Sequence, residues 1–239
     1  MTLMLHAGAN PAVYDELRQL ETPEATASHV PIPHYRIIDM LKHTLGFYGH
    51  EVTEEHHGIT PDGMRYFGLL SLKSVHTGYE DTVGLRNSHD KKFPVGVAFG
   101  SRVFVCDNLA FIADQEIKRR HTANAKRDLP GLVANIIEPL ADQRDAQHRT
   151  FERYRGTAIT DTLADQAIMA MYRKSVINVT RIADVLKEWE EPTFEDFRAD
   201  RTAWRLFNAA TFALTGRMVE NAHASRDLHM IIDGVCEAA

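Results

Sequence analysis

The stretch HEVTEEHHGITPDGMRYFGLLSLKSV, residues 50–75, constrains the fold of this chain more than any other part of the sequence. It contains two strand-like runs separated by Pro61-Asp62-Gly63. Proline presets φ at such a reversal, and glycine accepts the positive φ that a tight turn needs. The two runs therefore predict an antiparallel β-hairpin.

Further strands are predicted directly after the hairpin, in DTVGLRNS, FPVGVAFG and RVFVCDN. In the middle run the residues alternate between two faces, with Phe93, Val95, Val97 and Phe99 on one and Pro94, Gly96, Ala98 and Gly100 on the other. This period of two is typical of a strand and leaves one flat surface of small residues. We expect a helix or a ligand to lie close to that surface.

Helices are predicted on both sides of these strands. In HYRIIDMLKHTLGFYG the apolar residues share one helical stripe, and Gly49 is suited to end the helix. After the strands we expect a helix capped by Asp107 or Asn108 that runs to about Lys126, and later helices that start near Thr160, Thr180 and Arg201. In the last of these, TAWRLFNAATFAL, the side chains expected to be mostly buried are Trp204, Phe207 and Phe212.

The order of these elements predicts an α+β fold. An N-terminal helix packs on a mainly antiparallel sheet of about five strands, and an α-helical C-terminal half follows. We expect an N-terminal arm at residues 1–28, an α+β core at residues 29–112, and a helical region at residues 113–239 that packs on the core.

Cysteine content and hydropathy limit the cellular compartment and the kinds of cysteine site that the sequence allows. The two cysteines, Cys106 and Cys236, lie far apart in 239 residues and form no C-x-x-C pair, so neither a disulfide framework nor a thiolate zinc site is indicated. No apolar run approaches the length of a membrane span, and the first 20 residues lack the pattern of a signal peptide. We therefore expect a protein of the bacterial cytoplasm with no membrane partner.

Catalytic motifs are missing from the sequence. H-E-x-x-H is absent, and the adjacent His56 and His57 point to opposite sides of a strand, so no metal is expected. Neither of the glycine-rich phosphate-binding motifs occurs, and no cofactor is expected. Ser88 and His89 diverge on an extended chain, which disfavours a nucleophile and base pair. The cluster from Arg86 to Asp90 is therefore interpreted as a polar turn, we assign no catalytic residues, and a binding function is favoured over an enzymatic one.

Positive charge is concentrated in one part of an acidic chain. The net charge is -6, yet the nine bases and four acids between Arg86 and Arg127 leave +5 there and -11 elsewhere. If EIKRRHTANAKR is helical, its cations form a ridge able to follow a phosphate backbone. Unconnected surface charges are the alternative. The residues predicted to contact nucleic acid are Arg86, Asn87, His89, Lys91, Lys92, Arg102, Lys118, Arg119, Arg120, Lys126 and Arg127.

Four ordered blocks carry a resemblance to a known family: VGLRNSHD, VCDNLAF, RHT and TAWRLFNAAT. Together they resemble the phage/plasmid-like domain of unknown function that mobile elements of bacteria commonly carry, over residues from about Val30 to Gly216. The resemblance implies a mobile-element origin and an uncharacterised activity, with no catalytic residues to carry over. In topology the predicted elements are more distantly similar to phage single-strand annealing proteins of the Erf and RecT kind, which surround a basic groove and assemble into rings or filaments.

These observations favour a single-stranded DNA-binding protein used in phage or plasmid recombination or annealing, and a homo-oligomer is expected. The alternative is a mobile-element anti-defence protein that binds a host protein or factor, because an acidic surface can occupy a host protein's nucleic-acid site. An enzyme that acts through His89 is the third hypothesis. The preference for DNA over RNA stays open.

Overall fold

The computed structural model describes the backbone of residues 8–74, 79–103, 108–214 and 222–239, and within these ranges the side chains of all residues except 101–103, 108–116 and 222–223. The chain forms two compact units. The first comprises the described parts of Met1–Val75, Glu80–Gly100 and Gln115–Ala141. The second comprises those of His76–Tyr79, Ser101–Asp114 and Asp142–Ala239. Each unit is described separately below.

A six-stranded antiparallel sheet with the strand order β1-β2-β3-β4-β5-β6 organises the first half of the chain. Its strands are β1 (Asn10–Ala12), β2 (Val52–Ile59), β3 (Arg65–Leu72), β4 (Tyr79–Ser88), β5 (Val95–Val103) and β6 (Asn108–Arg119). The prediction of an α+β chain is confirmed. The sheet has more strands than the five expected, partly because the short β1 adds to the edge of β2, where Asn10 pairs with Ile59.

The hairpin predicted around Pro61-Asp62-Gly63 is the β2–β3 connection. Gly63 has a φ of +69°, the conformation for which glycine is suited. The turn is fixed by side chains as well, because the backbone N–H of Met64 donates to the Asp62 carboxylate over 3.0 Å and that of Arg65 donates to the Thr60 hydroxyl over 3.0 Å. The local sequence thus supplies hydrogen bonds that close this hairpin from within the turn.

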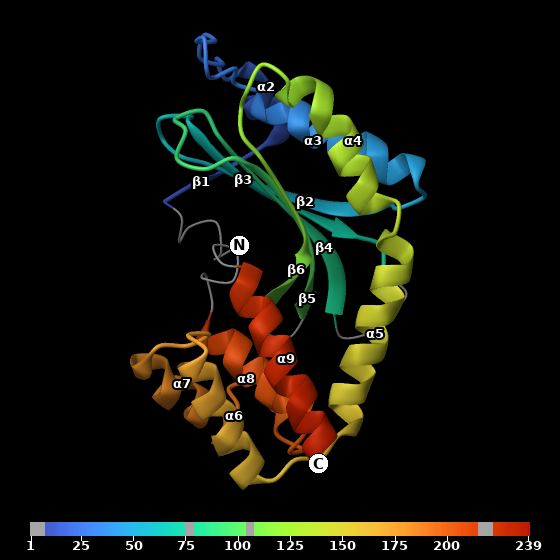
Figure 1. Cartoon of the computed structure of the whole chain (residues 1–239), viewed down its shortest axis with the longest axis vertical. Helices are drawn as coiled ribbons and strands as arrows, with labels where there is room; N and C mark the ends of the chain where they lie inside the picture. The colour runs from blue at the N-terminus through green and yellow to red at the C-terminus, as the bar shows by residue number, and fades with distance from the viewer. Residues whose placement is uncertain (1–7, 75–78, 104–107, 215–221) are drawn as a thin grey trace. The chain divides into compact units, whose positions relative to one another are not determined.

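Helix α3 (His34–Phe47) packs against α2 (Tyr14–Gln19), β2 and α4 (Ala125–Ile137). Figure 1 shows α3 and α4 side by side next to the sheet. The predicted apolar stripe of α3 is buried at Ile37, Leu41 and Leu45, and the helix ends just before Gly49, whose φ is +81°. Residues of β5 that were predicted to share one face are also buried, namely Val95, Val97 and Phe99. The core of the first unit therefore lies between α3, α4 and one face of the sheet.

The helix predicted from Asn108 to about Lys126 is wrong. Residues Asn108–Arg119 form strand β6, and the next helix, α4, begins at Ala125. Strand β6 pairs with β5 and supplies hydrogen-bond partners to backbone groups that would otherwise lie along an open edge. The pairing with β5 outweighs the local capping signal of Asp107 and Asn108. A helical ridge that joins Lys118 to Arg127 consequently does not form.

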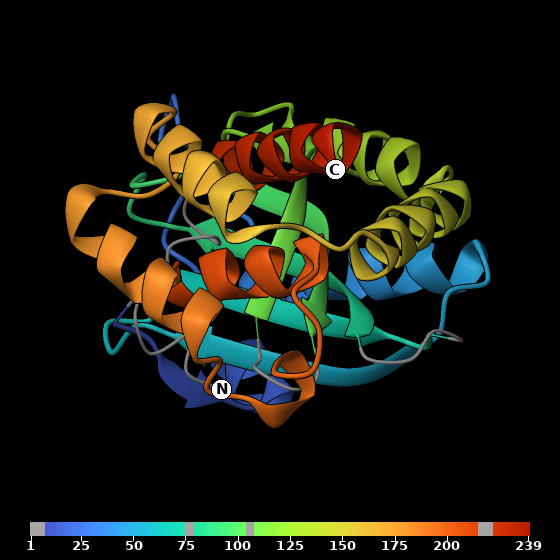
Figure 2. The same ribbon diagram turned by 90° about the horizontal axis from the view of Figure 1, so that it is seen from below.

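The second unit is mainly helical, and it also includes parts of strands β5 and β6. It contains most of α5 (Leu140–Gly156), together with α6 (Asp161–Arg173), α7 (Val179–Glu190), the 3-10 helix η1 (Glu195–Phe197), α8 (Ala203–Ala213) and α9 (Ala222–Ala238). Helix α6 begins as predicted, with the Thr160 hydroxyl accepting from the Leu163 N–H, whereas α7 and α8 are capped by Asn178 and Thr202. Figure 2 shows α6 to α9 in yellow-orange to red. None of the helices in the described ranges is long and apolar enough to cross a membrane.

Aromatic rings fill the core of the second unit. Trp204 and Phe207 are 7% and 1% exposed, as predicted, and their rings stack with centroids 5.7 Å apart. Phe151 of α5 lies against both, at 4.9 and 5.7 Å. Phe212 is only partly buried and meets Phe194 edge to face. Helix α8 is thus buried on nearly all sides and is the centre of this unit.

Replacing Trp204 with alanine is expected to lower the free energy of unfolding by about 3–5 kcal/mol, because the cavity left between Phe151 and Phe207 cannot collapse against rigid rings. Urea unfolding followed by circular dichroism measures the change. Val179→Ala serves as the control, since this side chain is 65% exposed and its loss is expected to change the stability by less than about 0.5 kcal/mol. Equal losses in the two variants would contradict the assignment of Trp204 to the core.

Candidate functional site

Four buried histidines lie together where separate segments of the first unit meet. His29 precedes α3, His34 is its first residue, His89 follows β4 and His121 follows β6. The rings of His34 and His89 stack with centroids 4.0 Å apart, and those of His29 and His121 lie 5.1 Å apart. This group, called the histidine cluster below, ties the segment before α3 to the ends of β4 and β6.

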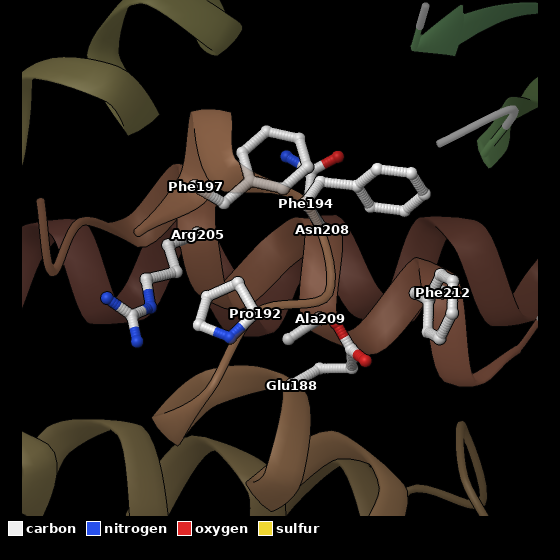
Figure 3. A pocket seen from close by; sticks show the side chains of 8 residues that line it. All are labelled: Glu188, Pro192, Phe194, Phe197, Arg205, Asn208, Ala209 and Phe212. Atoms are coloured by element: carbon white, nitrogen blue, oxygen red, sulfur yellow. The ribbon is translucent and has the colours of Figure 1, made fainter. Parts of the chain in front are cut away.

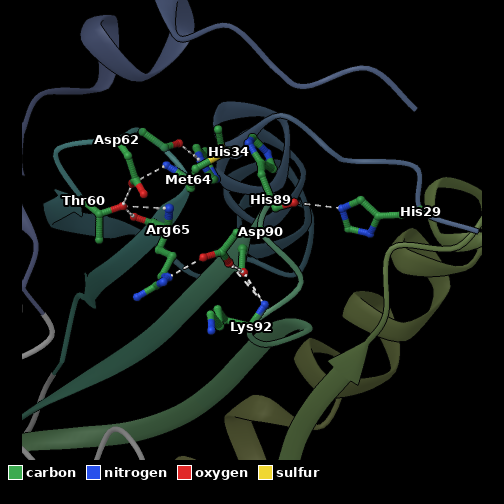
Figure 4. Close-up of polar contacts among 11 residues, drawn as sticks. His29, His34, Thr60, Asp62, Met64, Arg65, His89, Asp90 and Lys92 are labelled. Carbon is green, nitrogen blue, oxygen red and sulfur yellow. Dashed lines mark hydrogen bonds and ion pairs between the residues drawn. The ribbon is translucent and has the colours of Figure 1, made fainter. Parts of the chain in front are cut away.

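Backbone groups fix which ring nitrogen carries the hydrogen in this cluster. Three Nε2 atoms bond to carbonyls: His34 to Gly63 (3.1 Å), His89 to Ile32 (2.9 Å) and His29 to His89 (3.0 Å). Figure 4 shows the last of these bonds. A carbonyl only accepts, so each of these Nε2 atoms donates. In His121 it is Nδ1 that accepts, from the Ile32 N–H over 3.2 Å, and in the neutral ring the hydrogen is therefore on Nε2.

Burial keeps three rings of the histidine cluster, those of His34, His89 and His121, uncharged near neutral pH. Burial and the nearby His89 lower the pKa of His34 from 6.5 to about 3. Burial and then His29 lower the pKa of His121 to about 4. Burial also lowers the pKa of His89. Each of these three rings would carry a proton only at the expense of its solvation energy, so their hydrogen bonds are those of neutral imidazoles.

Asn87 and Ile32 connect the histidine cluster to the sheet. The side-chain amide of Asn87, fully buried at the end of β4, donates to the Ile32 carbonyl and to Nδ1 of His34, each over 2.9 Å. Since the ring nitrogens of His34 are both used in this way, the cluster does not offer them to a metal ion. Among the described residues, no three His, Cys, Asp or Glu side chains converge as metal ligands.

The segment after β4 is the polar turn that the sequence predicts. The Asp90 carboxylate accepts from the Ser88 hydroxyl, from the backbone N–H of Lys92 over 3.2 Å and from Nε of Arg65 over 2.7 Å (Figure 4). Lys91 adopts a φ of +67°, which is uncommon for a residue with a side chain. The Ser88 hydroxyl donates to the Asp90 carboxylate and not to the His89 ring, whose Nε2 donates to the Ile32 carbonyl. The geometry supports a shaped loop and not a nucleophilic triad.

A cleft opens beside this turn, with a volume of about 430 Å³. It is lined by Ser28, His29, Lys91, Lys92, Phe93, Pro94, Arg120, His121 and Thr122. These residues come from the segment before α3, from the β4–β5 loop and from the β6–α4 connection. Three of the nine are cations, and none of the described lining residues is acidic. We call this feature the basic cleft.

The structure brings three of the predicted contact residues together at the basic cleft, Lys91, Lys92 and Arg120, all of them exposed. Asn87 and His89, predicted to face a groove, are buried in and beside the histidine cluster instead. The Asn87 amide and the His89 ring both donate to the Ile32 carbonyl. These two side chains therefore support the cleft and do not contact a ligand within it.

Other predicted residues lie outside the lining of the cleft. Arg86 crosses the small-residue face of β5, where its side chain lies so close to Gly96 that a Cβ there would be 2.7 Å from Nε, and its guanidinium lies 5.6 Å from the centre of the Phe93 ring. Arg119 and Arg127 both pair with Asp128, over 2.6 and 3.0 Å. The remaining predicted contacts are Lys118 and Lys126, which are exposed, and Arg102, whose side chain lies outside the described residues.

Sequence reasoning missed the two histidines of the cleft. His29 and His121 are 92 positions apart; His29 belongs to no recognisable motif, and His121 belongs to the block RHT, which carries the family resemblance but assigns no role. The signal that could have found them is their position directly before a predicted helix and directly after a run of cations. Only the folding of β6 back along the sheet brings His121 to the segment that contains His29.

A second hollow, in the helical unit, is too small to be a binding site. Figure 3 shows its lining, Glu188, Pro192, Phe194, Phe197, Arg205, Asn208, Ala209 and Phe212. Its volume of about 10 Å³ holds at most one water molecule. The Arg205 guanidinium donates to the carbonyls of Trp189 and Glu190, so this buried cation holds the end of α7 in place. We assign it a structural role.

Comparison with known proteins gives a family but no characterised relative. The model of the family described as "Domain of unknown function (DUF932)" matches residues 26–227. The match covers most of the chain, and the chain therefore belongs to this family. Neither a curated protein nor a solved structure matches it.

Stability is expected to fall as the pH drops from about 6.5 towards 4. Well above pH 6.5 the rings of His34 and His121 are neutral in both the folded and the unfolded chain, so these two residues contribute no pH dependence there. Below pH 6.5 the unfolded chain binds protons that folded His34 and His121 do not bind, which favours unfolding by up to about 1.4 kcal/mol per pH unit for each ring. Urea unfolding at pH 7.5, 6.0 and 5.0 measures this slope above the range in which carboxylates titrate.

The variant His34→Gln tests the assignment, because the glutamine amide can still donate to the Gly63 carbonyl but does not titrate. Its slope between pH 6.0 and 5.0 is expected to be shallower than that of the unchanged protein by about 1 kcal/mol per pH unit. His43→Gln, a change at an exposed position of α3, controls for the loss of a histidine as such. Parallel slopes for His34→Gln and the unchanged protein would contradict the prediction.

Proposed function

We propose that this chain binds single-stranded nucleic acid through phosphate contacts in the basic cleft. The observation that carries the proposal is the convergence of Lys91, Lys92 and Arg120 on one cleft in a chain whose net charge is -6. Lysine and arginine bind phosphates by charge and hydrogen bonds, and release of counterions from the strand favours the complex.

Two acidic side chains that neighbour the cleft residues in sequence, Asp90 and Asp128, are engaged with other groups. Asp90 follows β4 next to Lys91, but its carboxylate is held by Arg65 and by the turn. Asp128 lies in α4, and its carboxylate pairs with Arg119 and Arg127. The cations that line the cleft therefore keep their charge for a ligand.

Apolar surface in the same cleft supports a strand with unpaired bases. The Phe93 ring is held between the Phe67 ring, 5.5 Å away, and the Arg86 guanidinium, 5.6 Å away, and it remains partly exposed next to Pro94. Bases of a single strand stack on such surfaces, whereas those of a duplex are already stacked on each other. Lys118 and Lys126, exposed on either side of Arg120 in sequence, extend the region of positive charge.

The proposal includes a use in phage or plasmid recombination or strand annealing by a homo-oligomer. This extension is supported by the resemblance of four sequence blocks to proteins of bacterial mobile elements, and by the lack of nucleotide-hydrolysis motifs in the sequence. Strand annealing is a binding function that needs neither a catalytic group nor ATP.

Binding of a labelled 20-nucleotide single strand, measured by fluorescence anisotropy at several salt concentrations, tests the proposal. The double variant Lys92→Ala/Arg120→Ala is expected to weaken binding nearly equally for different sequences, because phosphates carry no sequence information. The slope of log affinity against log salt is expected to become shallower by about 1.4, since each lost phosphate contact changes the slope for a single strand by about 0.7.

The matched control is Lys174→Ala/Lys187→Ala, which removes the same charge from exposed positions on and next to helices of the second unit. It is expected to keep the affinity and the salt slope of the unchanged protein. Undetectable or salt-insensitive binding by the unchanged protein would overturn the proposal. Recovery of a stoichiometric host protein from lysate in that case would favour the host-factor hypothesis.

A further inference from the structure

One buried ring nitrogen beside the basic cleft makes no hydrogen bond to a described residue. His121 is 4% exposed and is one of the residues that line the cleft, and its buried Nε2 is without a hydrogen-bond partner in the described part of the chain. Nδ1 of the same ring accepts from the Ile32 N–H, so Nε2 carries the hydrogen. A buried N–H without an acceptor is costly and usually has a partner that the protein alone does not show.

The surroundings of this donor define the chemistry of that partner. Lys91, Lys92 and Arg120 bring positive charge to the same cleft, and the lining includes the residues Ser28 and Thr122, whose hydroxyl groups can donate. No carboxylate belongs to the described lining. A cation is repelled by these groups, and a neutral carbonyl does not require three positive charges. An oxyanion with several acceptor oxygens satisfies them.

Among oxyanions, a phosphomonoester fits better than the phosphodiester of an internal position. A phosphomonoester has three terminal oxygens and a charge of about -1.5 to -2 at pH 7, whereas a phosphodiester has two such oxygens and a single charge. Three cations and a separate N–H donor exceed what one phosphodiester can use. The cleft volume of about 430 Å³ is also within the size range of a small-molecule site, which accommodates a phosphate with its adjoining nucleotide.

We propose that the basic cleft binds the terminal phosphate of a nucleic-acid strand, with Nε2–H of His121 donating to a phosphate oxygen and Lys91, Lys92 and Arg120 neutralising its charge. This inference rests on the proposed function, because it names the part of the strand that occupies the cleft. His121 acts here as a neutral donor, which agrees with the lowering of its pKa by burial. No bond is made or broken in the complex.

Three oligonucleotides of one sequence, with a 5′-phosphate, a 3′-phosphate or no terminal phosphate and with an internal dye, provide the test. The unchanged protein is expected to bind one of the two phosphorylated strands at least about tenfold more tightly than the strand without a terminal phosphate, as one charge-assisted hydrogen bond suffices for such a factor. Inorganic phosphate and thymidine monophosphate, added as competitors and as ligands in thermal unfolding, distinguish a strand end from a free phosphomonoester.

Two substitutions at His121 separate its donor from its structural bond. In His121→Asn the shorter amide takes the place of Nδ1 and can still accept from the Ile32 N–H, but the donor at Nε2 is lost. In His121→Gln the longer amide can donate where Nε2 does. The preference for a terminal phosphate, measured for each variant against its own affinity for the strand that lacks the phosphate, is expected to disappear in His121→Asn and to persist in His121→Gln.

The outcomes distinguish this inference from the proposed function. Equal affinity of the unchanged protein for all three strands would overturn the terminal-phosphate site and leave single-strand binding intact. Stabilisation by thymidine monophosphate or inorganic phosphate without any strand binding would overturn the proposed function together with the strand-end assignment. If both His121 variants unfold, the comparison of the three strands on the unchanged protein still decides the question.

Discussion

The candidate site depends on the backbone carbonyl and N–H of Ile32. Its carbonyl accepts from the Asn87 amide and from Nε2 of His89, and its N–H donates to Nδ1 of His121. These bonds join the segment before α3 to the ends of β4 and β6. Because the groups are buried, each bond made here avoids the cost of an unsatisfied polar group, and losing one partner is expensive. The basic cleft exists only while this junction holds its walls together.

Neutral histidines suit such a junction for a physical reason. An imidazole offers one donor and one acceptor at fixed positions on a flat ring, so it bonds to a carbonyl and still stacks on a neighbouring ring, as His34 and His89 do at 4.0 Å. A lysine or an arginine in the same place would bring a charge that the buried surroundings cannot solvate. The protein thus separates two roles, with uncharged rings inside the junction and permanent cations at its surface.

The sequence predicted the parts of the fold that depend on local pattern. The β2–β3 hairpin follows from Pro61-Asp62-Gly63, and the buried face of β5 follows from its period of two. The strand β6 was missed because Asp107 and Asn108 resemble a helix cap, although Leu109, Phe111 and Ile117 already alternate as a strand requires. A partner strand decided the outcome, and a single stretch of sequence does not reveal its partner.

The candidate site was predictable in its charges and not in its geometry. Lys91, Lys92 and Arg120 stand out as cations in the sequence, but the sequence does not say that Asn87 and His89, which lie beside them, turn inward. That choice follows from hydrogen bonds to Ile32, 55 and 57 positions away. Polar residues in a turn look alike in sequence whether they bind a ligand or hold the backbone that presents it.

The turn after β4 is stabilised by an acidic side chain that does not neutralise the lysines of the cleft. The Asp90 carboxylate accepts hydrogen bonds from Arg65, from Ser88 and from the backbone N–H of Lys92. These bonds fix the loop and engage no lysine side chain of the cleft. Lys91 takes the left-handed conformation within this fixed loop, and a side chain in that conformation leaves the chain in a different direction from its neighbours. Such strain persists where the surroundings enforce it, and here they enforce it next to a cleft. Asp90, an acid next to the cleft, therefore fixes the loop that carries Lys91 and Lys92.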